Sequence, residues 1–442
     1  MRFKAICPPE WLSKNAIYQI NPRTFSKEGT ISAITAELPF LKSLGFNIVY
    51  LCPIFEMDAS DELENFSKRQ LASETGNPKN MYRMNDYFSI DEEYGSMDDL
   101  RNMVNTAHSL DMKVIFDLVY AHIGPNAPII KEHPEFVLQK PDGSFVYTAW
   151  NFPALDFKCD GLREYLYCNM VYFVSVVGVD GFRCDVGDAV PVDFWKEARR
   201  RIRTIKSDAV LINEGFKPEY LEIAFDANYS FGWHDRLRKI YCGEENAYIL
   251  PEYYTKRKFE MPEGAKRLRD IDTHDTVTDW EGRTESIVGA KGMEQIIVMN
   301  YLIDGIPMIY CGNEICCTAY HNMFANRFYP GKYEVTDRDD KYSENSLRRQ
   351  TVLKTLNAMK NESDLLCYGD TEWLDTDAPE YVLAFKRVLD GKEIVFVGNT
   401  KNVDVEISTE LVNGKKCILS NAESKFDGDK LVLKPYEYVV VE

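Results

Sequence analysis

The chain alternates short apolar runs with longer segments in which apolar residues recur every three or four positions. A bounded run of four to eight apolar residues indicates a buried strand, and a 3.6-residue spacing indicates a helix with one buried face. Strands are predicted at residues 16–20, 47–55, 113–120, 210–214, 223–229, 266–272 and 306–311, with a further strand ending at residue 185. Helices are predicted at residues 31–44, 95–111, 162–177, 191–206, 291–302 and 345–359.

The pentapeptide at residues 181–185 (GFRCD) ends an apolar run, residues 171–179, that is typical of a short buried strand and overlaps the helix predicted before it. Side chains alternate along a strand, so Arg183 and Asp185 should point to one face and Phe182 and Cys184 to the other. A guanidinium beside a carboxylate would keep Asp185 ionised. A purely structural ion pair is the plainer interpretation of this motif on its own.

Eight strand–helix units favour an α/β fold of the (β/α)8 TIM-barrel type, whose chemistry lies at the C-terminal ends of the strands. An open doubly wound sheet is the alternative, but no G-x-G-x-x-G motif follows a predicted strand. Residues 123–160 interrupt the alternation after the third strand and are predicted to form a short inserted subdomain. After the last helix, strands are predicted at residues 381–387, 392–398, 403–407 and 430–441, which indicates a C-terminal all-β sandwich domain. We expect the barrel to comprise residues 1–122 and 161–362, the insertion 123–160 and the β domain 363–442.

Composition narrows the class of protein. The 442 residues carry 52 basic and 70 acidic side chains, and a net charge of −18 argues against nucleic acid or an anionic membrane as a partner. No apolar stretch approaches the ~20 residues of a membrane span, and the N-terminus shows no secretory signal. The 11 cysteines include no C-x-x-C pair, so we expect free structural thiols, no metal site and a cytoplasmic protein. The sequence leaves the oligomeric state open.

Acidic residues and histidines follow four of the predicted strands. Asp117 and His122 end the third, Asp185 ends the fourth, Glu214 ends the fifth, and His274 and Asp275 follow the seventh. Any one of them could be a helix cap, but a barrel would bring all of them to one rim. Three carboxylates with neutral imidazoles suit cleavage of a glycosidic bond, with retention of configuration if two of them lie about 5–5.5 Å apart. No histidine spacing supports a catalytic zinc.

The surroundings of two of these carboxylates predict different roles. Glu214 follows the apolar run 210–212, and partial desolvation should raise its pKa, as a general acid requires. Asp185 beside Arg183 should have its pKa lowered and remain ionised, as a nucleophile requires.

The motifs and their order resemble those of the α-amylase family of glycoside hydrolases. The resemblance rests on GFRCD, INEG at residues 212–215 and THD at residues 273–275, and the C-terminal β domain fits it. It implies that Asp185 is the nucleophile, Glu214 the general acid/base and Asp275 the carboxylate that stabilises the transition state. It also implies that Arg183, His122 and His274 hold the sugar in the cleavage subsite.

Three further segments carry the resemblance. In MYRMNDY at residues 81–87, Tyr82 stands where the family has a tyrosine that stacks on the sugar, and Asp86 belongs to the same substrate-binding motif. Residues 305–314 (GIPMIYCGNE) resemble the family's last-strand signature, and residues 151–157 (NFPALDF) its motif in the inserted domain. Aromatic residues of the insertion, Trp150 and Phe152 among them, could stack on sugars or simply pack the subdomain.

The chain departs from the family at three positions. Ala121 stands where the family commonly has an Asn that binds a structural calcium, and alanine supplies no oxygen ligand, so we expect no calcium there and no required cofactor. Thr273 replaces another Asn, and Met81 replaces a small residue.

The short insertion favours small soluble substrates. The expected activity is retaining hydrolysis of α-glucosidic bonds, mainly α-1,4, in malto-oligosaccharides or small α-glucosides. A transglycosylase or sucrose-acting enzyme of the same family is the near alternative. A non-catalytic sugar-binding barrel is the alternative from another class, although the three carboxylates argue against it.

Overall fold

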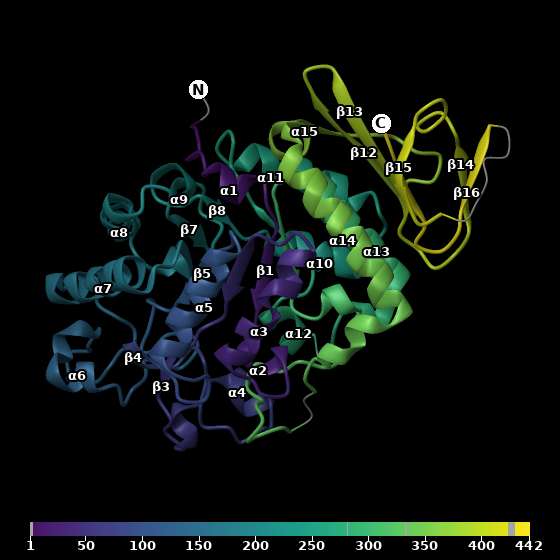
Figure 1. Cartoon of the computed structure of the whole chain (residues 1–442). Helices are drawn as coiled ribbons and strands as arrows, with labels where there is room; N and C mark the ends of the chain where they lie inside the picture. Colours follow the sequence, from purple (N-terminus) through teal and green to yellow (C-terminus); the bar gives the residue numbers. More distant parts are fainter. Residues whose placement is uncertain (1–2, 281, 332–333, 423–428) are drawn as a thin grey trace.

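The structure, a computed structural model, describes residues 3–280, 282–331, 334–422 and 429–442 (Figure 1). Its centre is an eight-stranded parallel sheet in the order β8-β7-β6-β5-β2-β1-β10-β9. The strands are β1 (Ile17–Ile20), β2 (Ile48–Leu51), β5 (Lys113–Leu118), β6 (Gly181–Cys184), β7 (Val210–Asn213), β8 (Ala227–Asn228), β9 (Leu268–Arg269) and β10 (Ile306–Tyr310). A parallel bridge between Asn228 and Arg267 joins the two edge strands and closes the ring. The predicted TIM barrel is confirmed.

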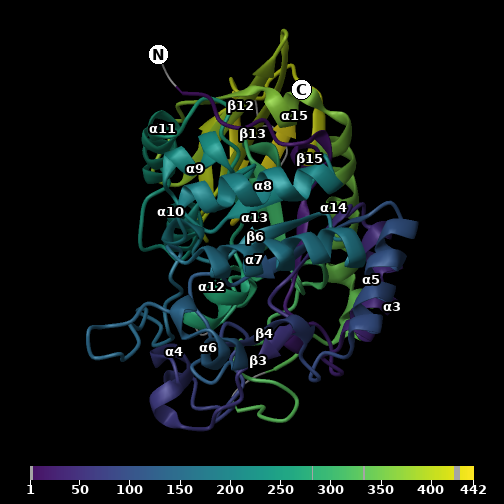
Figure 2. The ribbon, with the colours of Figure 1, turned by 90° about the vertical axis from the view of Figure 1, so that its left-hand side faces the viewer.

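Helices surround the barrel on its outside (Figures 1 and 2). The longer ones are α3 (Ile31–Ser43), α5 (Met97–Ser109), α7 (Asp160–Tyr172), α8 (Val192–Ile205), α10 (Phe231–Tyr241), α11 (Ile249–Glu260), α13 (Glu285–Leu302) and α14 (Glu344–Glu362). The shorter ones are α1 (Glu10–Ser13), α2 (Pro22–Phe25), α4 (Lys68–Ala72), α6 (Pro128–Glu132), α9 (Pro218–Ile223), α12 (His274–Asp279) and α15 (Asp364–Tyr368). None of the described helices has the length and hydropathy that a bilayer-spanning helix requires.

The apolar run at residues 171–179 is helical, which corrects the prediction of a strand there. Helix α7 continues into a π-helical turn, Phe173–Val177, and ends at Gly178 with φ of 92°. Phe173, Val174 and Val177 are buried at helical spacing, so the run packs one helix face rather than both faces of a strand. The strand before Asp185 is only Gly181–Cys184.

Other strands are shorter than the pattern predicted. The run at residues 47–55 divides into β2 and a separate strand, β3 (Phe55–Met57), which pairs antiparallel with β4 (Met84–Ile90). The sixth strand, predicted at residues 223–229, begins only after α9 (residues 218–223) has ended and has two residues. The seventh strand also has two residues. The polar segment at residues 56–80, predicted as a loop, contains α4.

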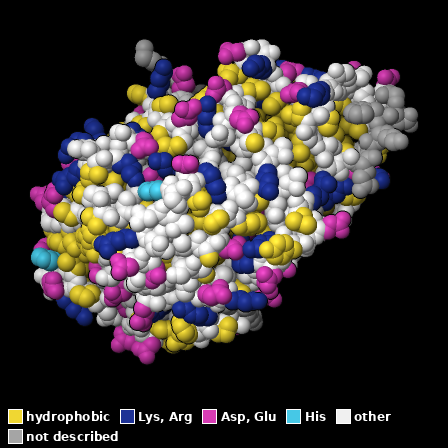
Figure 3. All heavy atoms as spheres, viewed as in Figure 1, with side chains coloured by type: hydrophobic (Ala, Val, Ile, Leu, Met, Phe, Trp, Pro, Cys, Tyr) yellow, Lys and Arg dark blue, Asp and Glu magenta, His cyan; other side chains and the backbone are white. Residues whose placement is uncertain are grey.

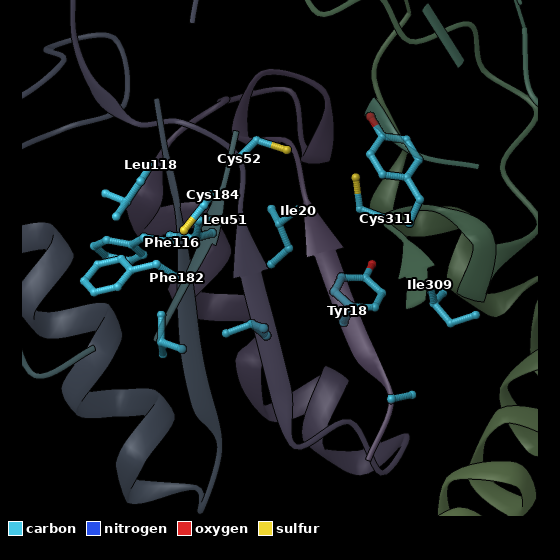
Figure 4. Close-up of a cluster of buried hydrophobic side chains, with 14 of the residues drawn as sticks. Tyr18, Ile20, Leu51, Cys52, Phe116, Leu118, Phe182, Cys184, Ile309 and Cys311 are labelled. Carbon is cyan, nitrogen blue, oxygen red and sulfur yellow. The ribbon is translucent and has the colours of Figure 1, made fainter. Parts of the chain in front are cut away.

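Side-chain alternation on the barrel strands separates two cores. Phe182 and Cys184 join Phe116 and Leu118 in the layer between strands and helices (Figure 4). Arg183 lies on the opposite face, inside the barrel, as predicted; it is buried and pairs with Asp117 on the neighbouring strand. The strands approach closely here, because a Cβ on Gly181 would lie 2.4 Å from the carbonyl oxygen of Val210.

The C-terminal residues form an antiparallel β unit beside α13 (Figure 1). Its larger sheet has the order β11 (Asp370–Trp373), β12 (Val382–Leu389), β13 (Lys392–Asn399), β17 (Tyr438–Val441) and β15 (Cys417–Ser420). A smaller sheet pairs β14 (Val405–Ser408) with β16 (Lys430–Leu433), so the strand predicted at residues 430–441 is two strands. Gln295 of α13 donates to the carbonyl oxygens of Asn399 and Glu437, which ties this unit to the barrel. Acidic and basic side chains are interspersed on the face seen in Figure 3.

Candidate active site

A pocket lies at the C-terminal ends of the barrel strands. Its lining residues are Ser67, Arg69, Asn80, Tyr82, His122, Trp150, Phe152, Asp185, Val186, Glu214, Asp275, Met323 and Phe324. Five of the residues predicted from the strand-end and tyrosine motifs are therefore brought together, and Arg183 and His274 lie directly behind them. The barrel produces this convergence because parallel strands present their C-terminal ends at one rim.

Arg183 stands at the centre of the charged groups. Its Nη1 donates to Asp117 Oδ1 at 2.7 Å and to Asp185 Oδ1 at 2.9 Å, and its Nη2 lies 3.0 Å from Glu214 Oε1. The other oxygen of Glu214 accepts the backbone N–H of Val186 at 2.7 Å. A single buried guanidinium thus holds three carboxyl groups from three adjacent strands.

Burial raises the pKa of all three carboxyl groups. It raises the pKa of Glu214 to about 8 and that of Asp117 to about 6, although Arg183 opposes both shifts. The prediction that Arg183 lowers the pKa of Asp185 is wrong in its net direction. Desolvation outweighs the guanidinium, which is shared with two other carboxyl groups, and raises the pKa of Asp185 to about 7.

Asp275 has the opposite electrostatic setting. It lies in the first turn of α12, whose N-cap is Thr273; the Oγ1 of that threonine accepts the N–H of Thr276 at 3.1 Å. The residue that departs from the family pattern therefore has a capping role here. Burial opposes ionisation of Asp275, but His274, Arg69 and Arg183 together hold its pKa well below the usual range. Arg69 Nη1 donates to Asp275 Oδ1 at 2.9 Å.

Tyr82 and His274 form one hydrogen-bonded unit. His274 Nδ1 accepts from Gln19 Nε2 at 2.9 Å, which leaves the ring proton on Nε2, beside the Tyr82 hydroxyl and 3.1 Å from Asp275 Oδ2. The Tyr82 hydroxyl in turn donates to Asp117 Oδ2 at 3.2 Å. Burial lowers the pKa of His274 to about 4, so the imidazole is a neutral donor at physiological pH.

His122 lines the pocket and has one ring nitrogen without a hydrogen-bond partner among the described residues. Its Nε2 donates to the Tyr82 carbonyl oxygen at 2.9 Å, and within the described chain its buried Nδ1 has no hydrogen-bond partner. Burial lowers the pKa of His122 to about 4, so this nitrogen remains unprotonated. The ring lies against Phe152 and Trp150, at centroid distances of 5.0 and 5.8 Å.

Asp86 is not brought to the pocket, which corrects its prediction as a substrate-binding residue. Its carboxylate accepts the backbone N–H of Phe88 at 2.9 Å and the hydroxyl of Ser89 at 2.7 Å, so it stabilises the backbone of β4. Asp117 is the reverse case: it was recognised at a strand end but was not predicted as a site residue, and it contacts both Arg183 and Tyr82.

Several lining residues come from loops that the motifs did not cover. Arg69 and Asn80 lie in the polar segment 58–80, and Met323 and Phe324 lie in the loop after β10. The only sequence signal for them was position, since loops that follow barrel strands build the rim.

Ala121, the position at which no calcium is expected, provides few oxygen ligands for a cation. The Ala121 side chain has no oxygen, and its carbonyl accepts the backbone N–H of Leu155 at 3.3 Å. Among the residues that the structure describes, no cluster of three or more His, Cys, Asp or Glu side chains could hold a metal ion.

Comparison with known proteins agrees with the motifs. A family model for the catalytic domain of alpha amylase matches residues 13–144. A cyclomaltodextrinase from Thermoanaerobacter pseudethanolicus is 26% identical, over 97% of this chain and 77% of its own. An intracellular maltogenic amylase of Bacillus subtilis is 22% identical, over 98% of this chain and 77% of its own.

Solved structures share the fold over the whole chain. An alpha-amylase from Lactobacillus plantarum superposes with a TM-score of 0.80 at 22% identity, over 98% of this chain and 99% of its own. A maltogenic alpha-amylase from Thermotoga neapolitana has a TM-score of 0.78 at 22% identity, over 97% of this chain and 96% of its own. Since relatives align along nearly its whole length and the matched model covers its first strands, the chain is similar to the alpha-amylase family of glycoside hydrolases.

Proposed function

We propose that this protein is a retaining glycoside hydrolase that cleaves α-1,4-glucosidic bonds of malto-oligosaccharides through a covalent glycosyl-enzyme intermediate. One observation carries the proposal: Asp185 and Glu214 contact the neighbouring Nη1 and Nη2 atoms of one guanidinium, at 2.9 and 3.0 Å. Retaining enzymes keep the two carboxyl groups about 5–5.5 Å apart and inverting enzymes about 6.5–9.5 Å, which leaves room for a water, and contact with one shared guanidinium favours the shorter separation.

The two carboxyl groups divide the chemistry. Glu214, whose raised pKa keeps it protonated, donates its proton to the glycosidic oxygen while ionised Asp185 attacks the anomeric carbon. The C–O bond to the leaving sugar breaks and an ester to Asp185 forms. Glu214, now a carboxylate, takes a proton from water, which attacks the anomeric carbon; the bond from that carbon to Asp185 breaks, and the sugar is released with its original configuration. Asp275, whose lowered pKa keeps it ionised, stabilises the positive charge on the sugar ring.

Neutral side chains complete the sugar site. The flat face of Tyr82, which lines the pocket, can pack on the sugar ring, and the rings of His122 and Trp150 line the same pocket. The printed names of the cyclomaltodextrinase and maltogenic amylase relatives support malto-oligosaccharides as the substrate class.

The test is product analysis. Purified protein incubated with maltotriose should release sugars whose first-formed anomer, followed by proton NMR, is α. Adding excess glucose as an acceptor distinguishes hydrolysis from transfer, because transfer would yield longer products. Release of the β anomer would contradict the retaining mechanism, and no turnover of any α-glucoside would favour a sugar-binding protein.

The same proposal places the enzyme in the cytoplasm and makes it independent of metal. All 11 cysteines lie in described parts of the chain and are free thiols, which suits a reducing compartment. One relative is named as intracellular. Fractionation of the source cells tests the location. An unchanged kcat/KM after dialysis against a chelator tests the metal independence that Ala121 suggests.

A further inference from the structure

One side of the pocket is walled by three segments that are far apart in sequence. They are the arm (residues 58–80), the inserted subdomain and the last-strand loop (residues 317–331). Asn151 of the insertion donates to the carbonyl oxygen of Phe66 in the arm at 3.2 Å. Asn77 of the arm donates to the carbonyl oxygen of Phe324 at 2.8 Å, and the N–H of Met323 donates to Thr278 of α12 at 3.1 Å. The wall is therefore continuous from the insertion to α12.

Arg69 fastens the arm across this wall to the carboxylate at the base of the site. Its Nη1 donates to Asp275 at 2.9 Å and its Nε to Asp279 at 2.8 Å, and its guanidinium lies 6.0 Å from the centre of the Phe324 ring. Charge-assisted hydrogen bonds to two carboxylates hold a planar guanidinium in a defined position. The pocket is therefore closed beside Asp275.

The residues after Glu214 are not joined to this wall. Phe216 is 60% exposed, and the backbone N–H groups of Phe216 and Lys217 donate to Asp188 on the adjacent turn, at 2.8 and 3.0 Å. In the described structure no hydrogen bond joins residues 214–217 to the arm, the insertion or the last-strand loop. A sugar chain that passes Glu214 therefore meets none of the hydrogen bonds that hold the wall together.

The position of the acid decides which part of the substrate lies in the closed end. Glu214 protonates the oxygen of the leaving group, so the leaving group lies on the Glu214 side of the cleaved bond. In an α-1,4-linked chain the preceding sugar is attached at C4, across the ring from the anomeric carbon. A preceding sugar would therefore point into the wall that contains Arg69 and Phe324.

We infer that the enzyme acts from the non-reducing end of its substrate and releases one glucosyl unit per cleavage, with Arg69 as a residue that determines this specificity. The inference rests on the proposed function and adds to it which bond of the chain is cut. It predicts that a substrate without a free non-reducing end cannot enter, because the wall excludes any group attached at C4.

The experiment compares three substrates with the parent protein: maltopentaose, the same chain carrying a benzylidene acetal on its non-reducing end, and a cyclodextrin. Glucose and maltotetraose should be the only first products of maltopentaose. The blocked and cyclic substrates should react at least about 100-fold more slowly in kcat/KM. Maltose or maltotriose as first products, or blocked chains cut at a comparable rate, would overturn the inference while leaving the hydrolase proposal intact. No turnover of maltopentaose would instead overturn the proposed function, and the inference with it.

Two variants test the wall itself. Arg69→Ala and Phe324→Ala should each raise the ratio of blocked to unblocked turnover by about tenfold or more, because each removes part of the wall. Arg69→Ala also removes a partner of Asp275, so its absolute rate should fall, and the ratio is the relevant readout. Lys68→Ala, an exposed neighbour on α4, is the matched control and should leave the ratio unchanged. A ratio within about twofold of the parent in both folded variants, checked by circular dichroism, would show that these side chains do not set the specificity.

Discussion

Replacing Glu214 with Gln separates proton donation from every other contribution of this side chain. The amide has nearly the same size, but both oxygens of Glu214 face donors, the N–H of Val186 at 2.7 Å and Arg183 Nη2 at 3.0 Å. The amide nitrogen must therefore face one of these donors, so either the hydrogen bond from Val186 or the ionic contact with Arg183 is lost. That loss costs about 1–3 kcal/mol of folding stability, which the fold should tolerate.

The catalytic loss should be larger and should depend on the leaving group. General acid catalysis contributes about 10²–10⁴-fold, or about 2.7–5.4 kcal/mol of barrier, so kcat/KM for maltotriose should fall by that factor. With α-glucosyl fluoride, whose leaving group needs no proton, the loss in the first step should be about tenfold or less. Azide, which needs no general base, should rescue turnover and give α-glucosyl azide.

One control variant accompanies this assay, and two outcomes would contradict the role of Glu214 as the general acid. Glu219→Gln on α9 removes an exposed carboxylate near the site and should leave both substrates unaffected. If Glu214→Gln retained maltotriose turnover within about tenfold of the parent, Glu214 would not be the general acid. Equal losses on both substrates would show that the side chain acts by positioning, not by proton transfer.

Three further predictions follow from the shared guanidinium. The kcat/KM profile should be bell-shaped, rising as Asp185 ionises with a pKa of about 7 and falling as Glu214 loses its proton with a pKa of about 8; an optimum below about pH 5 would contradict these assignments. In Asp117→Asn, loss of a nearby negative charge should lower the pKa of Asp185 and move the acid limb to lower pH, and an unmoved limb would exclude this coupling. The folded state keeps the Glu214 proton that the unfolded chain loses near its ordinary pKa, so this group's contribution to stability falls as pH rises from that value to about 8. The Tm of Glu214→Gln minus the Tm of the parent should therefore be more positive at pH 8 than at pH 5; a pH-independent difference measured by calorimetry would contradict the linkage.

The barrel could be predicted because its order rests on a repeated pattern. Each apolar run followed by an amphipathic segment indicates one strand–helix unit, and eight such units close a ring. The pattern failed at the run of residues 171–179, where valine-rich sequence suits a buried helix end as well as a strand. It also failed at β8 and β9, which keep two residues each and complete the ring through the bridge between Asn228 and Arg267. Tertiary closure, not local propensity, makes those short segments strands.

The residues of the candidate site also fall into two groups, those whose position the strand order predicts and those for which the sequence carries no signal. Asp185, Glu214 and Asp275 follow strands, so their meeting follows from the topology alone. Arg69 and Phe324 lie in segments with no periodic pattern, and the hydrogen bond between Asn77 and the Phe324 carbonyl that fastens the wall joins residues 247 positions apart. Such contacts depend on the folded backbone and have no local signal.

The charge around Arg183 shows most clearly what the sequence left out. Reading GFRCD as a pair of Arg183 and Asp185 predicts one positive and one negative charge, and hence an ionised nucleophile. In the structure the same guanidinium also contacts Asp117 and Glu214, so one positive charge faces three buried carboxyl groups. One cation stabilises one buried anion well, and further ionisation in this setting carries a desolvation cost that no partner offsets. Protons must therefore neutralise the excess, which is why all three pKa values rise. The highest of them belongs to Glu214, so the cluster keeps its proton on the group that must donate it.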